Sequence, residues 1–409
     1  MHKYFALTLS ALLMLASCGG GGYSSSTPPP PPSGGNVATL TVDSGPAGSV
    51  NTLFVSVTVC APGSSSNCQT IDHLQVDTAS WGLRIMASVL NSSLLSALPQ
   101  QMVAGTTTPV VECAQFADGY SWGPVVSADV AVSGEKASGL PIQVIGSAAF
   151  PATLAPSDCT SAGPEEDTVA TFGANGLIGV GVFLQDCGSG CATGVVPGTY
   201  YQCPTNGGAC TGIMEPVASQ VANPVGAFAA DNNGVIVEMA NVAANGATTA
   251  TGSLIFGIGT ESNNALVSAA TTLATDVNAG TITVAFNGTT YPLSILDSGS
   301  NAFFFTDSAL SVVPQGTVGA GFYGTPANLS ATITTLAGTQ LAATFTVGDA
   351  TSMFQAVPSG TAFPQLAGPI GATQNQTFDF GLPYFYGRNV YAAIETRSAG
   401  GTMGPFFAY

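Results

Sequence analysis

Leu74-Gln-Val-Asp-Thr-Ala-Ser80 has a counterpart in the second half of the chain, where Leu293-Ser-Ile-Leu-Asp-Ser-Gly-Ser300 repeats its pattern. Each stretch is an apolar, strand-like approach to one aspartate, followed by a hydroxyl residue, a small residue and serine. A strand that ends in this way makes a tight turn that presents the carboxylate. Two such turns meeting face to face would bring Asp77 and Asp297 together, so these two residues are the candidate catalytic pair.

Two facing carboxylates form an acid–base pair. Like charges held that close cannot both ionise, so the pair shares one proton. One carboxylate then activates a water molecule as general base, and the other protonates or polarises the scissile carbonyl. In each turn, we expect the first hydroxyl to bond the opposite loop and the following serine to bond the outer oxygen of the carboxylate. The residues expected to brace the loops and the pair are Thr78, Ser80, Ser298, Gly299 and Ser300.

With these two loops, the chain resembles the pepsin-type (bilobal) aspartic peptidase family, in which each lobe carries one Asp-Thr-Gly loop. Asn175–Gly179 resembles the apolar-apolar-Gly segment that crosses behind the first catalytic loop. Ser253–Gly257 resembles the glycine-ending strand near the lobe junction. Phe378–Tyr391 resembles the second apolar-apolar-Gly segment with the strand pair that closes the family's C-terminus. The resemblance spans about residues 50–409.

A hairpin over the site is expected at Phe116–Gly123, where the family has its flap. An Asp-Gly pair between apolar arms is a tight-turn signal. Phe116 stands at the flap tyrosine position, and Tyr120 across the hairpin is an alternative source of a phenol. The residues assigned to the flap are Phe116, Asp118, Gly119, Tyr120 and Trp122.

The chain departs from the family at two positions near the pair. Ala79 stands where the family has glycine, and its methyl group enters the most crowded part of the site. Asp379 interrupts the second apolar-apolar-Gly segment. The chain also resembles a narrower family of uncharacterised bacterial exported lipoproteins, which has an Asp-Thr-Gly-Ser-like motif and a Gly-Leu-Pro-aromatic segment.

The texture of the chain is that of an all-β protein. Valine, threonine and isoleucine alternate with small polar residues in short runs broken by glycine, asparagine and proline. Few segments have a helical period; residues 87–98 are expected as one short helix. No βαβ rhythm is present, which argues against a doubly wound nucleotide-binding sheet. The resemblance predicts a bilobal, pepsin-like fold of two pseudo-twofold-related β lobes around a cleft. Residues 37–250 would carry the Asp77 loop, the flap and the disulfides, and residues 251–409 the Asp297 loop.

The N-terminal sequence is typical of a signal peptide, with a basic start, an apolar stretch and small residues before Cys18. Leu-Ala-Ser-Cys at residues 15–18 resembles the bacterial lipobox, in which the cysteine is acylated. An ordinary signal peptide with a cysteine nearby is the alternative. We expect a lipoprotein signal peptide at 1–17, lipidation of Cys18 and a Gly/Ser/Pro-rich tether at 18–36. This predicts an exported lipoprotein of the cell envelope, on the periplasmic or surface face of the outer membrane, that meets the membrane only through its lipid anchor.

The other eight cysteines form an even set, which in an exported chain indicates disulfides. A zinc site is the weaker alternative, because the chain has no Cys-x-x-Cys pair and almost no histidine. Sequence alone does not fix the pairing. Short loops favour three pairs and leave a fourth: Cys60–Cys68, Cys187–Cys191, Cys203–Cys210 and Cys113–Cys159.

Charge and histidine content exclude several functions. The chain has 5 Lys+Arg against 22 Asp+Glu and a formal net charge of −17, so it lacks the cations that neutralise a nucleic-acid backbone. His2 and His73 are its only histidines, and His2 lies in the expected signal peptide. Catalysis through a histidine would therefore have to use His73, and a histidine-rich metal site is not possible. We expect no metal, no cofactor and a monomer.

Two further groups have both an ordinary and a functional interpretation. His73 can share a strand face with Asp77 and tune it, although an exposed strand histidine is the simpler interpretation. Glu165-Glu166-Asp167 could bind calcium. That run matches no ordered ligand spacing, so a solvated loop is the simpler interpretation.

The sequence therefore predicts an aspartic-type endopeptidase that hydrolyses extended peptide or unfolded protein outside the cytoplasm, with Asp77 and Asp297 as the dyad and water as the nucleophile. The first alternative is a catalytically inactive pepsin-like fold that binds a peptide or glycan at the cell envelope. The second is a structural envelope lipoprotein in which the aspartate pair is incidental.

Overall fold

The computed structural model describes residues 35–205 and 207–409, which belong to one compact unit. The expected signal peptide, the lipidated Cys18 and residues 18–34 of the expected tether lie outside the described residues. Within the described ranges, no helix is both long enough and apolar enough to cross a membrane.

The larger of the two main sheets has fourteen strands. Their bounds are β1 (Val37–Val42), β2 (Leu53–Cys60), β3 (Cys68–Asp77), β4 (Trp81–Met86), β5 (Val110–Gln115), β6 (Tyr120–Val132), β7 (Glu135–Ile145), β8 (Gly176–Val180), β9 (Tyr200–Gln202), β10 (Thr211–Gly212), β11 (Gly234–Met239), β12 (Ala250–Phe256), β20 (Asn389–Ala393) and β23 (Phe406–Ala408). Their spatial order is β10-β9-β5-β6-β7-β4-β8-β3-β2-β1-β12-β11-β20-β23.

The smaller main sheet has seven strands, and the helices are short. The strands are β13 (Ile282–Phe286), β14 (Thr289–Leu296), β15 (Phe303–Phe304), β16 (Ala327–Thr334), β17 (Gln340–Val347), β18 (Ala367–Gly368) and β19 (Asp379–Phe380). Their order is β17-β16-β13-β14-β19-β15-β18, and a separate hairpin joins β21 (Ser398–Ala399) to β22 (Thr402–Met403). The α-helices are α1 (Ser92–Ala97), α2 (Ser157–Thr160), α3 (Val169–Phe172), α4 (Ser189–Thr193) and α5 (Ala350–Ala356).

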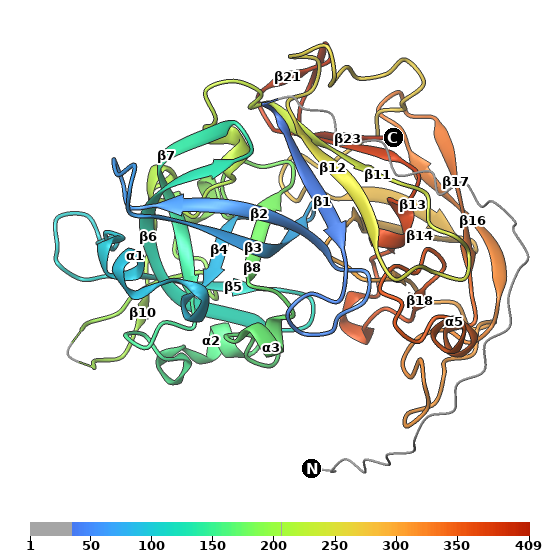
Figure 1. The fold of residues 1–409 in the computed structure, drawn as a ribbon, viewed down its shortest axis with the longest axis horizontal. Helices are drawn as coiled ribbons and strands as arrows, with labels where there is room; N and C mark the ends of the chain where they lie inside the picture. The colour runs from blue at the N-terminus through green and yellow to red at the C-terminus, as the bar shows by residue number, and fades with distance from the viewer. Residues whose placement is uncertain (1–34, 206) are drawn as a thin grey trace, which may run out of the picture. The chain divides into compact units, whose positions relative to one another are not determined.

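The two halves of the molecule repeat one arrangement of four strands. In the first half β3 runs parallel to β8, β8 antiparallel to β4, and β4 parallel to β7. In the second half β14 runs parallel to β19, β19 antiparallel to β15, and β15 parallel to β18. The matching strands β3 and β14 lead to Asp77 and Asp297. The repeat confirms the predicted all-β fold with two related lobes, which lie on opposite sides of the molecule in Figure 1.

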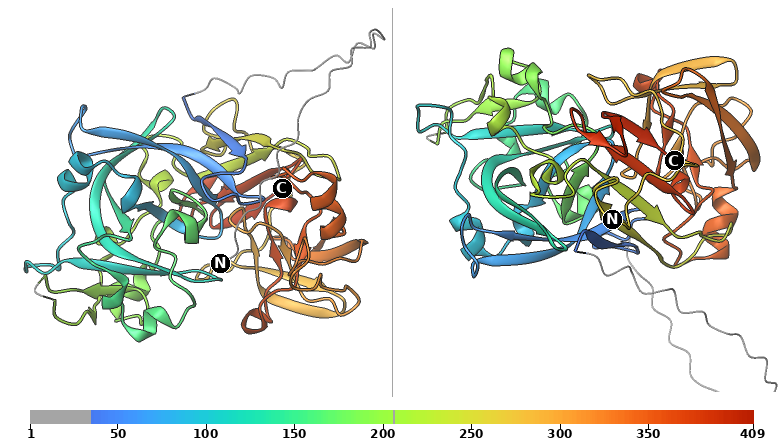
Figure 2. Two further views of the ribbon diagram at one scale, coloured as in Figure 1. Left: turned by 60° about the horizontal axis from the view of Figure 1, so that its bottom comes forward. Right: turned by 90° about the horizontal axis from the view of Figure 1, so that it is seen from above.

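Strands from both ends of the described chain join the lobes. β1 pairs with β2 on one side and β12 on the other, and β11 pairs with β12 and β20. β23 completes the edge beside β20. Figure 1 shows β1, β12, β11 and β23 between the lobes, and Figure 2 shows the red C-terminal strands there. The C-terminal strands therefore belong to the fourteen-stranded sheet, and β12 runs across the expected boundary between residues 250 and 251.

The core of the second lobe is aromatic. The rings of Phe305 and Phe378 stack with centroids 4.9 Å apart, and Phe286, Phe345 and Phe380 surround them. Packed rings of this kind bury a large apolar area and fix their neighbours. Phe304 precedes Phe305 in the chain. Because side chains alternate across a strand, Phe304 faces the opposite way and lines the cavity that contains the two aspartates.

Four disulfide bonds stabilise the first lobe. They join Cys60–Cys68, Cys113–Cys159, Cys187–Cys191 and Cys203–Cys210. Three of them are the pairs that the short loops favoured, and Cys113–Cys159 is the pair that these left. The bond between Cys113 and Cys159 ties β5 to α2 and packs against Trp122, so it supports the base of the β5–β6 hairpin.

The helix expected at residues 87–98 forms in two pieces, so the prediction of one helix was wrong. A single 3-10 turn spans Ala87–Val89, and α1 begins only at Ser92. Asn91 lies between them with extended backbone, and its side chain accepts a hydrogen bond from the Leu94 amide at 2.8 Å. An asparagine that caps a helix in this way sets the helix start, because its own backbone stays outside the helix.

Candidate active site

The two aspartates lie at the ends of matching strands and are held in the same way. Asp77 is the last residue of β3, and Asp297 follows β14 directly. The Ala79 amide donates to Asp77 Oδ1 at 2.7 Å, and the Gly299 amide donates to Asp297 Oδ1 at 2.7 Å. In both turns the backbone therefore orients the carboxylate two residues back, and alanine at position 79 does not prevent this.

The residues after the aspartates bind the two loops to each other. Thr78 Oγ1 donates to the Leu296 carbonyl at 2.7 Å and accepts from the Ser298 amide at 3.0 Å. Ser298 Oγ donates to the Val76 carbonyl at 2.7 Å and accepts from the Thr78 amide at 3.2 Å. Both side chains are fully buried, so water cannot replace these bonds. The four bonds fix the loops face to face, as expected of Thr78 and Ser298.

Gly299 lies where both carboxylates approach the backbone. A Cβ built on it would be 2.8 Å from Asp77 Cγ and 3.0 Å from Oδ1 of both Asp77 and Asp297. Real Cβ atoms essentially never come within 3.0 Å of other heavy atoms, so only glycine fits here. Gln75 fixes this residue further, donating from Nε2 to the Gly299 carbonyl at 2.6 Å. Both Oδ1 atoms thus face one point between the loops.

The shared environment favours the protonated form of Asp297. Burial is the main cause that raises its pKa well above the usual value, and the negative charges of Asp77 and Asp379 raise it further. A side-chain hydrogen bond with Asp77 acts in the same direction, while the bond with Ser300 lowers the pKa. The two aspartates therefore titrate as a coupled pair that retains a proton.

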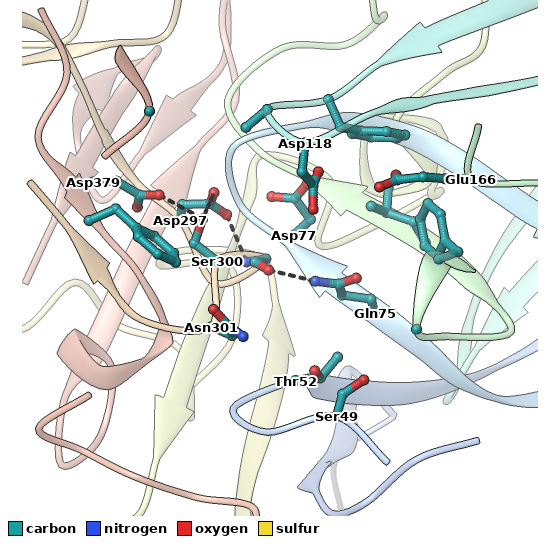
Figure 3. Close-up of a pocket in the computed structure, with 18 of the residues that line it drawn as sticks. Ser49, Thr52, Gln75, Asp77, Asp118, Glu166, Asp297, Ser300, Asn301 and Asp379 are labelled. Carbon is teal, nitrogen blue, oxygen red and sulfur yellow. Dashed lines mark hydrogen bonds between the residues drawn. The ribbon is translucent and has the colours of Figure 1, made fainter. Parts of the chain in front are cut away.

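A third carboxylate completes the cluster. Ser300 Oγ lies 2.8 Å from Asp297 Oδ2 and 2.6 Å from Asp379 Oδ2 (Figure 3). Asp379 is 6% exposed, and its Oδ1 atom is buried without a hydrogen-bond partner among residues 35–205 and 207–409. Burial raises the pKa of Asp379 to about 8, although the Ser300 bond lowers it, and the charge of Asp77 raises it. In the sequence, the one sign of this residue is its interruption of an apolar segment.

The two serines of the repeated turns differ. Ser300 bonds the outer oxygen of Asp297, as expected. Ser80 Oγ is buried and has no hydrogen-bond partner among the described residues, so its expected bond to Asp77 was wrong. The backbone of Ser80 instead accepts from the Gly181 amide at 3.0 Å. A serine hydroxyl has three staggered positions, and the local packing, not the motif, selects one of them.

The hairpin expected as a flap covers one side of a cavity of about 590 Å³ that both lobes line. The turn between β5 and β6 contributes Phe116, Ala117 and Asp118 to the cavity wall. The backbone amide of Phe116 donates to the Gly119 carbonyl at 2.8 Å and closes this turn. Phe116 also packs edge-on against Phe172, with ring centroids 5.8 Å apart. Both aromatic rings thereby form an apolar wall beside the aspartates.

Two residues assigned to the flap point away from the cavity. Tyr120 and Trp122 are buried, in a core cluster with the Cys113–Cys159 disulfide. Tyr120 therefore does not supply a phenol to the site, and that expectation was wrong. Gly119, also assigned to the flap, does not line the cavity either. Strand alternation explains this, because β6 turns one face toward α2 and that face carries both aromatic rings.

The cavity is strongly acidic. Five of its lining residues carry carboxylates, and no lysine, arginine or histidine lines it within the described ranges. Burial, with the charges of Asp118 and Asp167, raises the pKa of Glu166 to about 7. Figure 3 shows these side chains around one space. The five acidic residues are Asp77, Asp118, Glu166, Asp297 and Asp379.

Two other groups from the sequence lie apart from the dyad. His73 contacts Asp43 at 3.2 Å and Asp72 at 3.1 Å, and it does not line the cavity. Asp167 accepts a hydrogen bond from the Trp122 amide at 2.9 Å, so it supports the hairpin. Over the described ranges, no group of three histidine, cysteine, aspartate or glutamate side chains is arranged to hold a metal ion.

Comparison with known proteins places the chain in a family. A crystal structure of aspartic proteinase from Irpex lacteus is similar to it, with 14% sequence identity, a TM-score of 0.48, and coverage of 91% of this chain and 96% of that one. Among curated proteins, none matches the chain. The family model described as "Protein of unknown function (DUF3443)" matches residues 32–409, so the chain belongs to that family.

Proposed function

We propose that the protein is an aspartic-type endopeptidase that hydrolyses peptide bonds with Asp77, Asp297 and an activated water molecule. One observation carries the proposal: two buried carboxylates, presented by matching turns, are fixed face to face by the hydrogen bonds between Thr78 and Ser298. Such a pair holds one proton and offers both an acid and a base to the same substrate atom.

The reaction conserves this proton. As water attacks the carbonyl carbon, it gives a proton to the ionised carboxylate, and the protonated carboxyl gives its proton to the carbonyl oxygen. The neutral gem-diol then breaks its C–N bond. The newly protonated carboxyl donates to the leaving nitrogen, and a gem-diol hydroxyl returns a proton to the other carboxylate. The dyad ends as it began. The raised pKa of Asp297 makes it the carboxyl that starts protonated, so Asp77 acts first as the base.

The cavity fits an extended chain better than a folded one. It is lined from both lobes and covered on one side by the β5–β6 turn, so a substrate strand would lie across the aspartates between Phe116 and the Phe304 side. Binding there requires a segment without its own tertiary contacts. Unfolded protein or flexible peptide is therefore the proposed substrate, and no cofactor is part of the proposal.

We propose further that the protein works at the cell envelope as a lipoprotein. The lipobox-like sequence before Cys18 supports this, and so do four disulfide bonds, which form and persist in oxidising compartments. Expression with a labelled fatty acid tests it. Label should appear in the full chain and not in Cys18→Ala; equal labelling of both would overturn the proposal.

The catalytic proposal is tested by cleavage of a reduced, unfolded protein from pH 3 to pH 8, with new termini identified by mass spectrometry. Asp77→Asn and Asp297→Asn should each abolish cleavage while melting like the wild type. Asp72→Asn is the matched control, since Asp72 is an exposed aspartate on the same strand as Asp77. A statine-type inhibitor should block the wild type. Cleavage by Asp297→Asn at the wild-type rate would overturn the assignment.

A further inference from the structure

We propose that Asp379 is a positioning residue of the dyad: it acts as a protonated carboxyl that donates to Ser300, whose hydroxyl then donates to Asp297. This inference rests on the proposed function only for its effect on rate. Its structural content is a hydrogen-bonded chain of three side chains, from Asp379 Oδ2 through Ser300 Oγ to Asp297 Oδ2.

The Ser300 hydroxyl has fewer protons than it has carboxyl contacts. A serine hydroxyl has one proton to donate, yet Ser300 Oγ lies within hydrogen-bond distance of two carboxyl oxygens, 2.8 Å from Asp297 and 2.6 Å from Asp379. If both carboxyls were ionised, one contact would press two electron-rich oxygens together in a buried site. The proton of the dyad lies in the side-chain hydrogen bond between Asp297 and Asp77, so one of the two carboxyls must bring a further proton to the Ser300 contacts.

The other contacts assign that proton to Asp379. Asp297 Oδ1 already accepts from the Gly299 amide, and Asp297 shares the proton of the dyad with Asp77. Asp379 Oδ1 is buried and has no partner in the part of the chain that the structure describes, so an ionised Asp379 would keep half of its charge unsolvated. The lower-energy arrangement puts the proton on Asp379 and points the Ser300 hydroxyl at Asp297.

The surroundings of Asp379 support this assignment. Two titratable groups face it: Asp297 at the end of β14 and Asp77 at the end of β3, both acidic. On the other side β15 contributes Phe303 and Phe304, which do not titrate. Burial raises the pKa of Asp379 to about 8, so it is neutral below that pH.

Within the described residues, this hydrogen-bonded chain of three side chains is present in the second lobe and not in the first. Ile295 pairs with Asp379 in the second lobe, and Gln75 pairs with Leu177 at the equivalent place in the first. The Leu177 side chain cannot donate, and the Ser80 hydroxyl has no hydrogen-bond partner within the described ranges. The pair is therefore asymmetric. The outer oxygen of Asp297 accepts a hydrogen bond from Ser300, whereas Ser80 makes no such bond to Asp77 in the described structure.

The experiment compares Asp379→Asn with Asp379→Leu. The asparagine amide can donate to Ser300 but cannot ionise. Leucine, the residue at the equivalent place in the first lobe, can neither donate nor ionise. Asp379→Asn should keep kcat within a few-fold of the wild type at pH 4 to 6. Asp379→Leu should lose about tenfold to a hundredfold in kcat, the effect of one hydrogen bond to a charged group, with little change in KM.

The pH profile separates positioning from a structural role. At a pH above the pKa values of both groups, the wild type has lost two protons that catalysis needs, one from the dyad and one from Asp379, whose pKa is raised to about 8. Its log kcat/KM should therefore fall with a slope approaching −2. Asp379→Asn should fall with a slope of −1. Leu177→Asn, which places the same amide in the other lobe, should keep the steeper slope whatever its KM. Identical slopes in Asp379→Asn and the wild type would overturn the proposal.

A second measurement needs no activity. Because folding raises the pKa of Asp379, the folded state binds a proton that the unfolded state has released between about pH 4 and pH 8. Wild-type stability should therefore fall through this range more steeply than that of Asp379→Asn, as measured by urea unfolding. A flatter curve for the variant in a protein that cleaves nothing would retain the positioning proposal and reject the peptidase; parallel curves would reject the positioning proposal alone.

Discussion

Thr78 and Ser298 exchange hydrogen bonds across the junction of the two lobes, each hydroxyl donating to the opposite strand end and accepting from the other residue's amide. The bonds are buried, and the two residues occupy equivalent places in the repeated turns. These bonds between immediate neighbours of Asp77 and Asp297 therefore hold the two aspartates close together.

Thr78→Val should lower stability while leaving the packing of this junction unchanged, because valine has the volume of threonine but no hydroxyl. The change leaves the Leu296 carbonyl and the Ser298 amide without a partner in a buried site, and each such loss costs about 1–3 kcal/mol. Urea unfolding measures the cost, and the cleavage rate should fall with it. Thr58→Val is the control, since the Thr58–Thr70 pair is exposed; an equal loss there would contradict the explanation.

Adding a methyl group at position 299 should lower kcat, whereas removing one at position 79 should keep or raise it. Gly299→Ala places a Cβ 2.8 Å from the Asp77 carboxyl carbon, so the carboxylates must move apart and kcat should fall at least a hundredfold. Ala79→Gly removes a methyl group from the other turn, and it should keep or raise kcat at a cost of about 0.5–1 kcal/mol in stability. Steady-state kinetics and thermal melting check both. Full activity in Gly299→Ala would show that the crowding is not limiting.

Stability should fall as the pH rises from about 4 to about 8. Burial raises the pKa values of Asp379 to about 8, Glu166 and Glu215 to about 7, and Asp167 to about 6. A carboxyl with a raised pKa is protonated when folded and ionised when unfolded in this window, so the folded state binds more protons and loses stability with increasing pH. Calorimetry should give a higher Tm at pH 5 than at pH 8. A Tm that rises between these values would contradict the shifts.

The four disulfides should contribute unequally. In the chain-entropy model, the bond that closes 46 residues, Cys113–Cys159, contributes about 4 kcal/mol, and the bond that closes 4 residues, Cys187–Cys191, about 2 kcal/mol. Replacing each pair by alanine and measuring urea unfolding tests the difference. The longer loop also holds the β5–β6 hairpin, so its removal should raise KM as well. Equal losses from both pairs would argue against the loop-closure explanation.

The repeated turns made the dyad visible in the sequence, because a strand, an aspartate, a hydroxyl and a small residue are adjacent in the chain. Asp379 was visible only as an interruption. Its partner Ser300 is 79 residues away, and only the parallel pairing of β14 with β19 brings them together. Ser80 and Ser300 hold equivalent positions in the two turns, yet among the described residues only the Ser300 hydroxyl has hydrogen-bond partners, a difference that the motif does not predict. The hairpin at Phe116 was also foreseen, but the face that its rings occupy depends on where α2 packs.

The sheet between the lobes has a consequence for synthesis. β1 near the start of the described chain and β23 at its end belong to one sheet, and β20 and β23 join it only after the second lobe has been made. A nascent chain that ends before residue 389 holds Asp77 and Asp297 without the strands that complete this sheet. Contacts so distant in sequence form late. A partly made chain therefore lacks a finished scaffold for its acid pair, so the proposed hydrolysis would begin only after the C-terminal strands have joined the sheet.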